Sequence, residues 1–265
     1  MDDDGYLLDN RSARAGTRLD GLAAIFDPPT FRHIDALGIG DGWRCWEVGA
    51  GGPSVVRWLA QRVGPCGQVL ATDIDVTWTQ DVIGPTVDVR KHDVARDAPP
   101  PQTFDLVHAR LVLVHVAHRD QALRSMVQVL RPGGWLLVED ADPALQPLSC
   151  LDPQSPEEEL ANKLRAGFRG LMARRGVDLA YGRKLPRLLR AAGLIDVAAD
   201  AYFPVALPEC ALVELTTIDL IRDELVRHDI ATDAEVDQHL ANVTAGRLDL
   251  AQPPLISAWG RVPPD

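Results

Sequence analysis

The sequence predicts an α/β fold, in which a doubly wound, mostly parallel sheet carries helices on both faces. Residues 44–64 combine a short apolar run, a glycine-rich turn and an amphipathic segment, and this strand–turn–helix unit is typical of such sheets. Strand-like and helix-like segments then alternate up to residue 140, and strands that are separated by helices pair in parallel. The chain of 265 residues is long enough to bury a sizeable core.

The N-terminal residues 11–38 are predicted to be helical, because one face is apolar through Leu19, Leu22, Ala23 and Phe26. Asp27-Pro28-Pro29 is expected to break this helix. A second short helix over residues 30–37 then ends at Gly38. Because these helices precede the first core strand, we interpret residues 1–40 as a helical cap over the ligand-binding edge of the sheet.

The first core strand is predicted over residues 44–48. Glycines in residues 49–52 leave the backbone bare where a ligand could approach it. Pro53 suits the first position of a helix, since its missing N–H costs nothing there. Gly64 is placed to end that helix, whose apolar positions recur at helical spacing at Val56, Leu59, Ala60 and Val63.

Four further core strands are predicted at residues 68–73, 87–94, 104–109 and 135–138. A helix is predicted over residues 119–130, and Arg131-Pro132-Gly133-Gly134 is expected to terminate it. Glu139 and Asp140 are expected to close the fifth strand. Further along the chain, the predicted elements are helices at 186–192 and 209–226, a helix opened by Thr232 and Glu235, and strands at 194–203 and 255–262.

The pattern changes after Pro143. Ser155 and Glu158 form a capping box with Pro156 at the first helical position, and an apolar stripe follows at Leu160, Leu164, Phe168, Leu171 and Met172. Packing is the favoured interpretation of this stripe, and a role facing a cofactor is the alternative. We interpret residues 150–180 as a lid inserted into a core of residues 41–265, within one structural domain.

Composition narrows the class of partner. The net charge of −11 argues against a nucleic-acid-binding surface and favours a small-molecule substrate. The four cysteines are scattered without metal-ligand spacing, so free thiols in a reducing compartment and no metal site are expected. No apolar run approaches the roughly 20 residues that span a bilayer, and the first residues are acidic, unlike a signal peptide. We expect a cytoplasmic protein without membrane contact; a homodimer stays open.

Glu47 lies two residues before the glycine turn, where it suits a cationic ligand. Ser54 stands where a dinucleotide site would have its third glycine. The resulting E-x-G-x-G arrangement resembles motif I of the class I S-adenosylmethionine-dependent methyltransferases. Residues 104–110 and 130–134 are similar to the fourth strand of that family and to its loop before the fifth. Over residues 44–140 the chain resembles small-molecule methyltransferases of the quinone-biosynthesis and natural-product type.

This resemblance implies a Rossmann-like sheet of seven strands, the last antiparallel. It implies S-adenosyl-L-methionine as cofactor and S-adenosyl-L-homocysteine as product. The implied reaction is methyl transfer to oxygen, nitrogen or carbon of a small organic acceptor, such as an aromatic or polyketide-like natural product or a quinone precursor. Two alternatives stay open. One is a protein of the same fold that binds the cofactor without methylating, and the other is an NAD-dependent oxidoreductase.

The order of residues along the chain assigns the cofactor site. Asp73 ends the second strand about 20 residues beyond the turn, where an acid holds ribose hydroxyls; a helix N-cap is the alternative. Ile74 would lie against the adenine, and Asp93 with the N–H of Val94 would bind the adenine edge. The cofactor-binding set is Glu47, Gly49, Ala50, Gly51, Asp73, Ile74, Asp93, Val94, Ala109 and Arg18.

Two members of this set have alternatives of their own. Arg18 corresponds to an arginine that faces the methionine carboxylate in related methyltransferases, but it is also explained as a solvated side chain on an amphipathic helix. Glu47 is expected to accept from the cofactor's ammonium group. It could instead accept from backbone amides of the turn or neutralise Arg44.

A catalytic base is needed only if the acceptor must lose a proton. The candidates are His108, His115 and His118, and His115 is preferred because it follows the fourth strand near the expected reaction site. The alternative for His115 is a packing role. Substrate-ordering candidates are Tyr181, Arg183 and Arg110.

Overall fold

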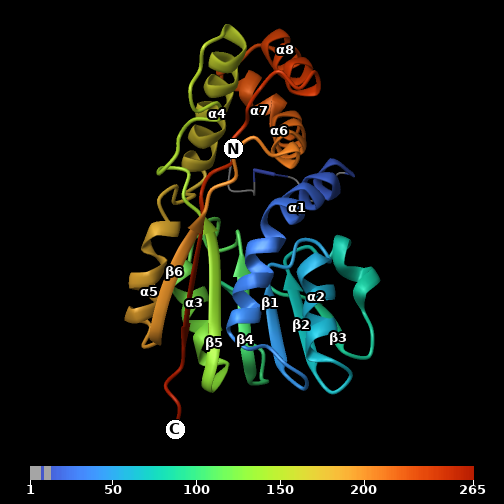
Figure 1. Cartoon of the computed structure of the whole chain (residues 1–265), viewed down its shortest axis with the longest axis vertical. Coiled ribbons are helices and arrows are strands. Elements are labelled where there is room, and N and C mark those ends of the chain that lie inside the picture. The colour runs from blue at the N-terminus through green and yellow to red at the C-terminus, as the bar shows by residue number, and fades with distance from the viewer. Residues whose placement is uncertain (1–6, 9–12) are drawn as a thin grey trace. The chain divides into compact units, whose positions relative to one another are not determined.

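The computed structural model describes residues 7–8 and 13–265. It contains a seven-stranded sheet in the order β3-β2-β1-β4-β5-β7-β6 (Figure 1). The strands are β1 (Arg44–Val48), β2 (Gln68–Asp73), β3 (Val87–Lys91), β4 (Phe104–Arg110), β5 (Leu130–Ala141), β6 (Ile195–Tyr202) and β7 (Leu255–Arg261). β1 to β5 pair in parallel, whereas β7 is antiparallel to both of its neighbours. The predicted doubly wound sheet with an antiparallel last strand is confirmed.

The other elements are helices of varied length. They are α1 (Ala13–Ala36), α2 (Ser54–Val63), α3 (Arg119–Gln128), α4 (Pro156–Arg174), α5 (Leu185–Ala191), α6 (Pro208–Leu220), α7 (Arg222–Arg227), α8 (Asp233–Thr244) and the 3₁₀-helices η1 (Thr77–Val82) and η2 (Gly182–Lys184). No helix among the described residues is both long and apolar enough to cross a bilayer.

The described residues fall into two compact units. The sheet unit consists of residues 27–141, 181–202 and 255–265 and contains all seven strands. The helical unit consists of residues 142–180, 203–254 and the described residues before Asp27. The proposed cap (1–40), core (41–265) and lid (150–180) describe roles toward a ligand and stay predictions; residues 1–6 and 9–12 of that cap lie outside the described residues.

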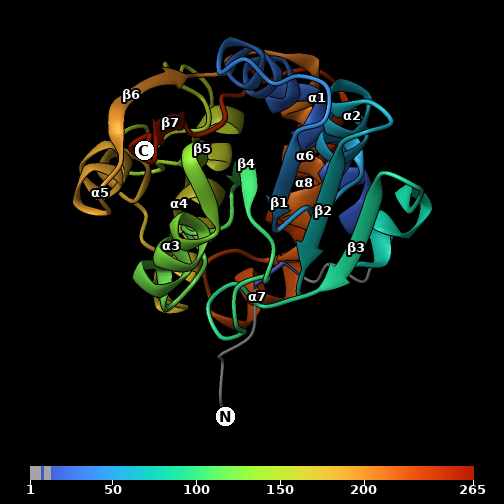
Figure 2. The same cartoon turned by 90° about the horizontal axis from the view of Figure 1, so that it is seen from below.

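The core of the sheet unit lies between the sheet and the helices α1 and α2. Ile34 of α1 and Leu59 of α2 are fully buried with strand residues such as Leu106. The rings of Phe31 and Trp58 stack at 4.5 Å between their centroids, which joins the two helices. Figure 2 shows α1 and α2 on one side of the sheet and α3 on the other.

The prediction of a helix break at Asp27-Pro28-Pro29 is wrong. α1 continues through both prolines to Ala36, and the predicted helix at 30–37 is its last part. Each proline removes a backbone N–H donor, but burial compensates, because Pro29, Thr30 and Ile34 all lie in the protein interior. Gly38, with a φ of 88°, follows the helix as expected.

The prediction for Arg131-Pro132-Gly133-Gly134 is also wrong. α3 already ends at Gln128, and the four residues lie inside β5. Leu130 pairs with Phe104 and Trp135 with Leu106, so residues 131–134 form a bulge. A Cβ at Gly134 would lie 2.9 Å from the carbonyl oxygen of Arg131, which explains the glycine. β5 ends at Ala141, directly after Glu139 and Asp140, within one residue of the predicted end.

The helical unit follows its predicted capping signals. Ser155 caps α4 by accepting from the backbone N–H of Glu158, and Thr232 with Glu235 forms the capping box of α8. Leu164 and Leu171 of the α4 stripe pack within the unit's apolar core, as the packing interpretation expects. The predicted helix at 209–226 is divided into α6 and α7 at Ile221.

Candidate functional site

The turn between β1 and α2 depends on glycine. Gly49 and Gly51 have φ values of 64° and 58°, a region that side chains disfavour. A Cβ at Gly49 would also clash with the side chain of Val112, which lies in the segment after β4. Pro53 has helical backbone angles directly before α2. The turn therefore presents bare backbone at the carboxyl edge of the sheet, as predicted.

Asp73 joins this turn to the end of β2. One carboxylate oxygen accepts from the backbone N–H of Gly51 at 2.9 Å, and the other accepts from that of Asp75 at 2.9 Å. Burial raises the pKa of Asp73, and the two backbone hydrogen bonds oppose that rise. The helix-cap alternative is wrong, because the N-cap of η1 is Val76.

The other predicted adenosine contacts surround the same edge. Ile74 is 53% exposed, so its apolar face is accessible to a ligand. Asp93 follows β3 and accepts from the backbone N–H of Ala95 at 2.9 Å, while Val94 is buried. Ala109 lies near the end of β4, paired with Val48. Their roles toward a cofactor stay predictions.

Glu47 has a partner that its sequence neighbours do not indicate. It lies directly opposite His108 on β4, and Nδ1 of His108 donates to Oε2 of Glu47 at 2.6 Å. Among the described residues no turn amide donates to this carboxylate. Arg44 is exposed and donates its backbone N–H to Asp105. The turn-amide and Arg44 alternatives for Glu47 are therefore wrong in this structure.

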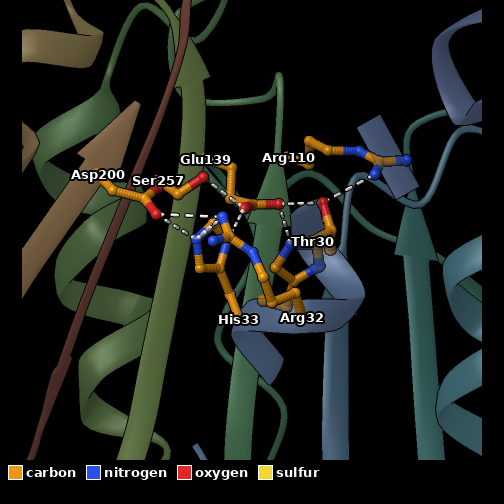
Figure 3. Close-up of polar contacts among 8 residues, drawn as sticks. Thr30, Arg32, His33, Arg110, Glu139, Asp200 and Ser257 are labelled. Atoms are coloured by element: carbon orange, nitrogen blue, oxygen red, sulfur yellow. Dashed lines mark hydrogen bonds and ion pairs between the residues drawn. The ribbon is translucent and has the colours of Figure 1, made fainter. Parts of the chain in front are cut away.

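A second buried carboxylate, Glu139 on β5, organises the polar interior of the sheet unit (Figure 3). Its Oε1 accepts from His33 at 3.1 Å and from Ser257 at 2.6 Å. Its Oε2 accepts from Thr30 and, at 3.2 Å, from Nε2 of His108. α1, β4, β5 and β7 are thus joined through one side chain that is fully buried.

The two carboxylates keep His108 charged. Burial alone would lower the pKa of His108, but Glu47 and Glu139 outweigh it and raise the pKa to about 9. The hydrogen bonds from His108 and His33 hold the pKa of Glu139 well below its usual range despite complete burial. Both ring nitrogens of His108 are already bonded to buried carboxylates, so this arrangement favours a structural role for His108 over that of a base.

Two series of hydrogen bonds extend from Glu139, one through His33 and the other through Thr30. His33 donates to Asp200 at 3.0 Å, and Asp200 also accepts from Arg32 at 3.2 Å (Figure 3). On the other side Arg110 donates to Thr30 at 2.9 Å and to Asp27 at 2.8 Å. Arg110, a candidate for ordering substrate, is thus bound to α1.

The remaining candidates are placed as follows. His115 lies in the segment after β4, where its N–H donates to the carbonyl of Val112 at 3.0 Å. His118 is exposed and directly precedes α3. Arg18, in the helical unit, donates from Nε to Thr217 at 3.0 Å. The other two are Tyr181, which is buried with the Arg119 guanidinium 5.5 Å from its ring centroid, and Arg183, which is exposed in η2.

Sequence reasoning missed Thr30, His33, Glu139 and Ser257 as one cluster. Their separations along the chain exceed 100 residues for each contact with Glu139. A usable signal does exist, because Glu47, His108 and Glu139 are ionisable residues inside otherwise apolar strands. Such residues are almost never fully buried unless they are paired.

The sheet order and the glycine turn together define the class I methyltransferase fold. Residues 46–138 match the family model of a methyltransferase domain. This segment includes the turn, Asp73, Asp93, most of β1 and the strands β2 to β4. The resemblance to class I S-adenosylmethionine-dependent methyltransferases is confirmed for the fold, and residues 46–138 match a methyltransferase domain.

Particular relatives share parts of the chain. A ubiquinone/menaquinone biosynthesis C-methyltransferase of Pseudomonas paraeruginosa is 31% identical over 113 residues, which cover 40% of this chain and 44% of the relative. Methyltransferase str3 of Strobilurus tenacellus is 27% identical over 187 residues, 69% of this chain and 62% of that protein. The chain thus spans less than two thirds of the length of these relatives.

A solved structure is similar over nearly the whole chain. The phosphoethanolamine N-methyltransferase 2 of Haemonchus contortus, in complex with S-adenosyl-L-methionine, aligns with a TM-score of 0.61 at 16% identity. The alignment covers 98% of this chain and 60% of that protein. At this identity the similarity shows the shared fold.

Proposed function

We propose that this protein binds S-adenosyl-L-methionine at the glycine turn and transfers its methyl group to a small organic acceptor. The observation that supports this most directly is the hydrogen bond from Gly51 to Asp73, which fixes a carboxylate beside bare backbone in the segment that matches a methyltransferase domain. The residues fit the cofactor chemically. Apolar Ile74 is exposed at the end of β2. The carboxylate of Glu47 precedes the turn, and that of Asp73 accepts a hydrogen bond from it.

The adenosine half would be held by the ends of β2 and β3. The carboxylate oxygens of Asp73 can each accept a second hydrogen bond, from the ribose hydroxyls. Ile74 would cover one face of the adenine. Asp93 would accept from the exocyclic amine while the N–H of Val94 donates to a ring nitrogen.

The amino-acid half would lie over the turn itself. Gly49, Ala50 and Gly51 allow close approach to the backbone, and Glu47 supplies negative charge for the ammonium group. Ala109 would contribute backbone at the end of β4. The assignment of Arg18 to the cofactor's carboxylate stays a prediction.

Methyl transfer from this cofactor needs few catalytic groups from the protein. The bound cofactor supplies a methyl group on a sulfonium, which is already an activated leaving group. The chain's residues align acceptor and cofactor, and effective molarities of about 10⁵ M or more are known for well-aligned reactions. Where the acceptor must lose a proton, we propose His115 as the base.

The proposed acceptor is an aromatic or polyketide-like natural product or a quinone precursor. Support comes from the quinone-pathway relative. We further propose a cytoplasmic setting without nucleic-acid or membrane partners, because the net charge is −11 and the four cysteines are free. A homodimer is compatible with these proposals.

The cofactor assignment is tested by thermal shift and calorimetry. S-adenosyl-L-homocysteine should raise the melting temperature, whereas NAD should not, because only a ligand of the native state stabilises it. Stabilisation by NAD alone would favour the oxidoreductase alternative. Transfer is then tested with methyl-labelled cofactor and a metabolite extract. Binding without label on any metabolite would favour the alternative of a protein that binds but does not methylate.

The role of His115 is tested by His115→Ala. If His115 is the base, turnover should fall at least about a hundredfold, the lower end of the range of general-base contributions. The affinity for S-adenosyl-L-homocysteine should stay unchanged, which calorimetry checks. Full turnover in this variant would assign His115 to packing.

A further inference from the structure

One imidazole lies between two buried carboxylates in the middle of the sheet. β4 pairs with β1 on one side and with β5 on the other. His108 on β4 donates from Nδ1 to Glu47 at 2.6 Å and from Nε2 to Glu139 at 3.2 Å. Both of its ring nitrogens are donors, which requires the imidazolium form.

The two carboxylates are satisfied to different extents. Glu139 accepts from four side chains, two on each oxygen: His33, Ser257, Thr30 and His108. The Glu47 side chain accepts from His108 through Oε2. Its Oε1 has no hydrogen-bond partner among the described residues. Glu47 also lies two residues before Gly49. The carboxylate with the unpartnered Oε1 therefore belongs to the end of β1 that leads into the turn.

A purely structural role, in which both carboxylates only join strands, does not explain why Glu47 accepts fewer hydrogen bonds than Glu139. Burying ions costs several kcal/mol each unless they are well paired, and apolar replacements are often as stable. Glu139 already connects α1, β4 and β7 to β5 through saturated hydrogen bonds. Glu47 adds a second buried carboxylate whose hydrogen bonding is incomplete. A carboxylate in this condition suits a ligand that brings a cationic donor.

We propose that His108 is a positioning residue for the cofactor: its hydrogen bond to Oε2 holds the Glu47 carboxylate in place, so that Oε1 accepts from the cofactor's ammonium group. This inference rests on the proposed function. The charged groups around His108 are Glu47 on β1 and Glu139 on β5. Behind Glu139 lie His33 and Arg110, and Asp200 faces His33.

The test is the affinity for S-adenosyl-L-homocysteine between pH 6 and pH 8, measured by calorimetry. In the wild type His108 stays charged over this range, since its pKa is raised to about 9 by Glu47 and Glu139, and this pair should add no pH dependence. In His108→Gln, Glu47 loses the imidazolium whose hydrogen bond holds its carboxylate in place. The affinity should fall to roughly tenfold below the wild type across this range, about the contribution of one hydrogen bond to a charged group.

Three variants provide the controls. Glu47→Gln should weaken binding at every pH, and adding His108→Gln to it should cause no further loss, because His108 acts through Glu47. His239→Gln is the matched control. His239 is also fully buried and bonded to a glutamate, Glu214 at 3.0 Å, but in the helical unit. It should lower stability and leave the affinity and its pH profile unchanged.

A second measurement covers the case that His108→Gln does not fold. In the wild type, ¹⁵N NMR of the histidine rings should show both nitrogens of His108 protonated at pH 7.5. Addition of S-adenosyl-L-homocysteine should shift the Nδ1 signal. A neutral ring at this pH, or a folded His108→Gln with wild-type affinity at pH 6, would overturn the inference while the proposed function stands. Absence of binding by the wild type would instead overturn the proposed function.

Discussion

Asp73 and Gly51 meet although they belong to different strand–helix units. The carboxylate accepts from the backbone of the turn and from Asp75, and it is largely buried. A ligand at this edge would find the acid already oriented, because two backbone hydrogen bonds fix its oxygens. Such preorganisation reduces what ordering costs on binding.

Asp73→Ala should therefore weaken binding of S-adenosyl-L-homocysteine by roughly 1.5–3 kcal/mol, the range for hydrogen bonds to a charged group. Calorimetry measures the difference. Asp75→Ala is the matched control, since Asp75 accepts from Thr77 and is not assigned to the cofactor. Equal affinities in wild type and Asp73→Ala would refute the ribose assignment.

Single residues were predictable where a local motif specifies them. Gly49, Gly51 and Asp73 follow from spacing along the chain, and the structure brings them together. The partner of Glu47 did not follow, because His108 lies 61 residues away. Strand pairing alone places the two side chains opposite each other.

At the scale of elements, α1 shows how tertiary contacts override a local signal. Two consecutive prolines predict a break, yet the helix continues because its buried residues contact the sheet. Thr30 and His33 both donate to Glu139. A fully buried anion on β5 thus stabilises the helix beyond its prolines. Similarly, neither glycine nor proline marks the division between α6 and α7, so periodicity could not reveal it.

Pro28→Ala tests this account of α1. Pro28 is exposed, so the replacement loses little packing and restores a backbone donor inside the helix. The free energy of unfolding should rise by about 1–2 kcal/mol, less than the ~3 kcal/mol helix penalty of proline, because the unfolded chain also gains freedom. Urea denaturation measures it. Pro29→Ala, at a buried position, should gain less; destabilisation by Pro28→Ala would contradict the account.

At the scale of the whole molecule, the buried charges couple folding to pH. The pKa of His108 is raised from 6.5 to about 9 by Glu47 and Glu139. The stability that this shift contributes is complete below pH 6.5 and is lost as the pH rises through 9. The pKa of His33 is raised in the same direction, through Glu139 and Asp200 against the effect of burial.

The free energy of unfolding should therefore fall by about 3 kcal/mol between pH 6.5 and pH 9, from the His108 shift alone. Urea denaturation at a series of pH values measures the slope. His108→Gln should be less stable at pH 6.5 and flatter across this window. A wild type whose stability does not change over the window would show that His108 is not charged in the native state.

The fold as a whole was predictable because strand and helix signals alternate so regularly over residues 44–140. The division into a sheet unit and a helical unit was not, because each unit is assembled from three separate segments. Apolar periodicity identifies a packed face without identifying what it packs against. The stripe on α4 illustrates this, since its partners include α7 and α8, which follow much later in the chain.

The place of β7 in the sheet also bears on biosynthesis. β7 lies between β5 and β6 and pairs with both. A ribosome makes β6 first and then the whole segment 203–254 before it delivers β7. Until then β6 has no neighbouring strand to pair with, and one edge of β5 also stays unpaired. A nascent chain of this protein therefore has to keep two strand edges from aggregating until late in translation.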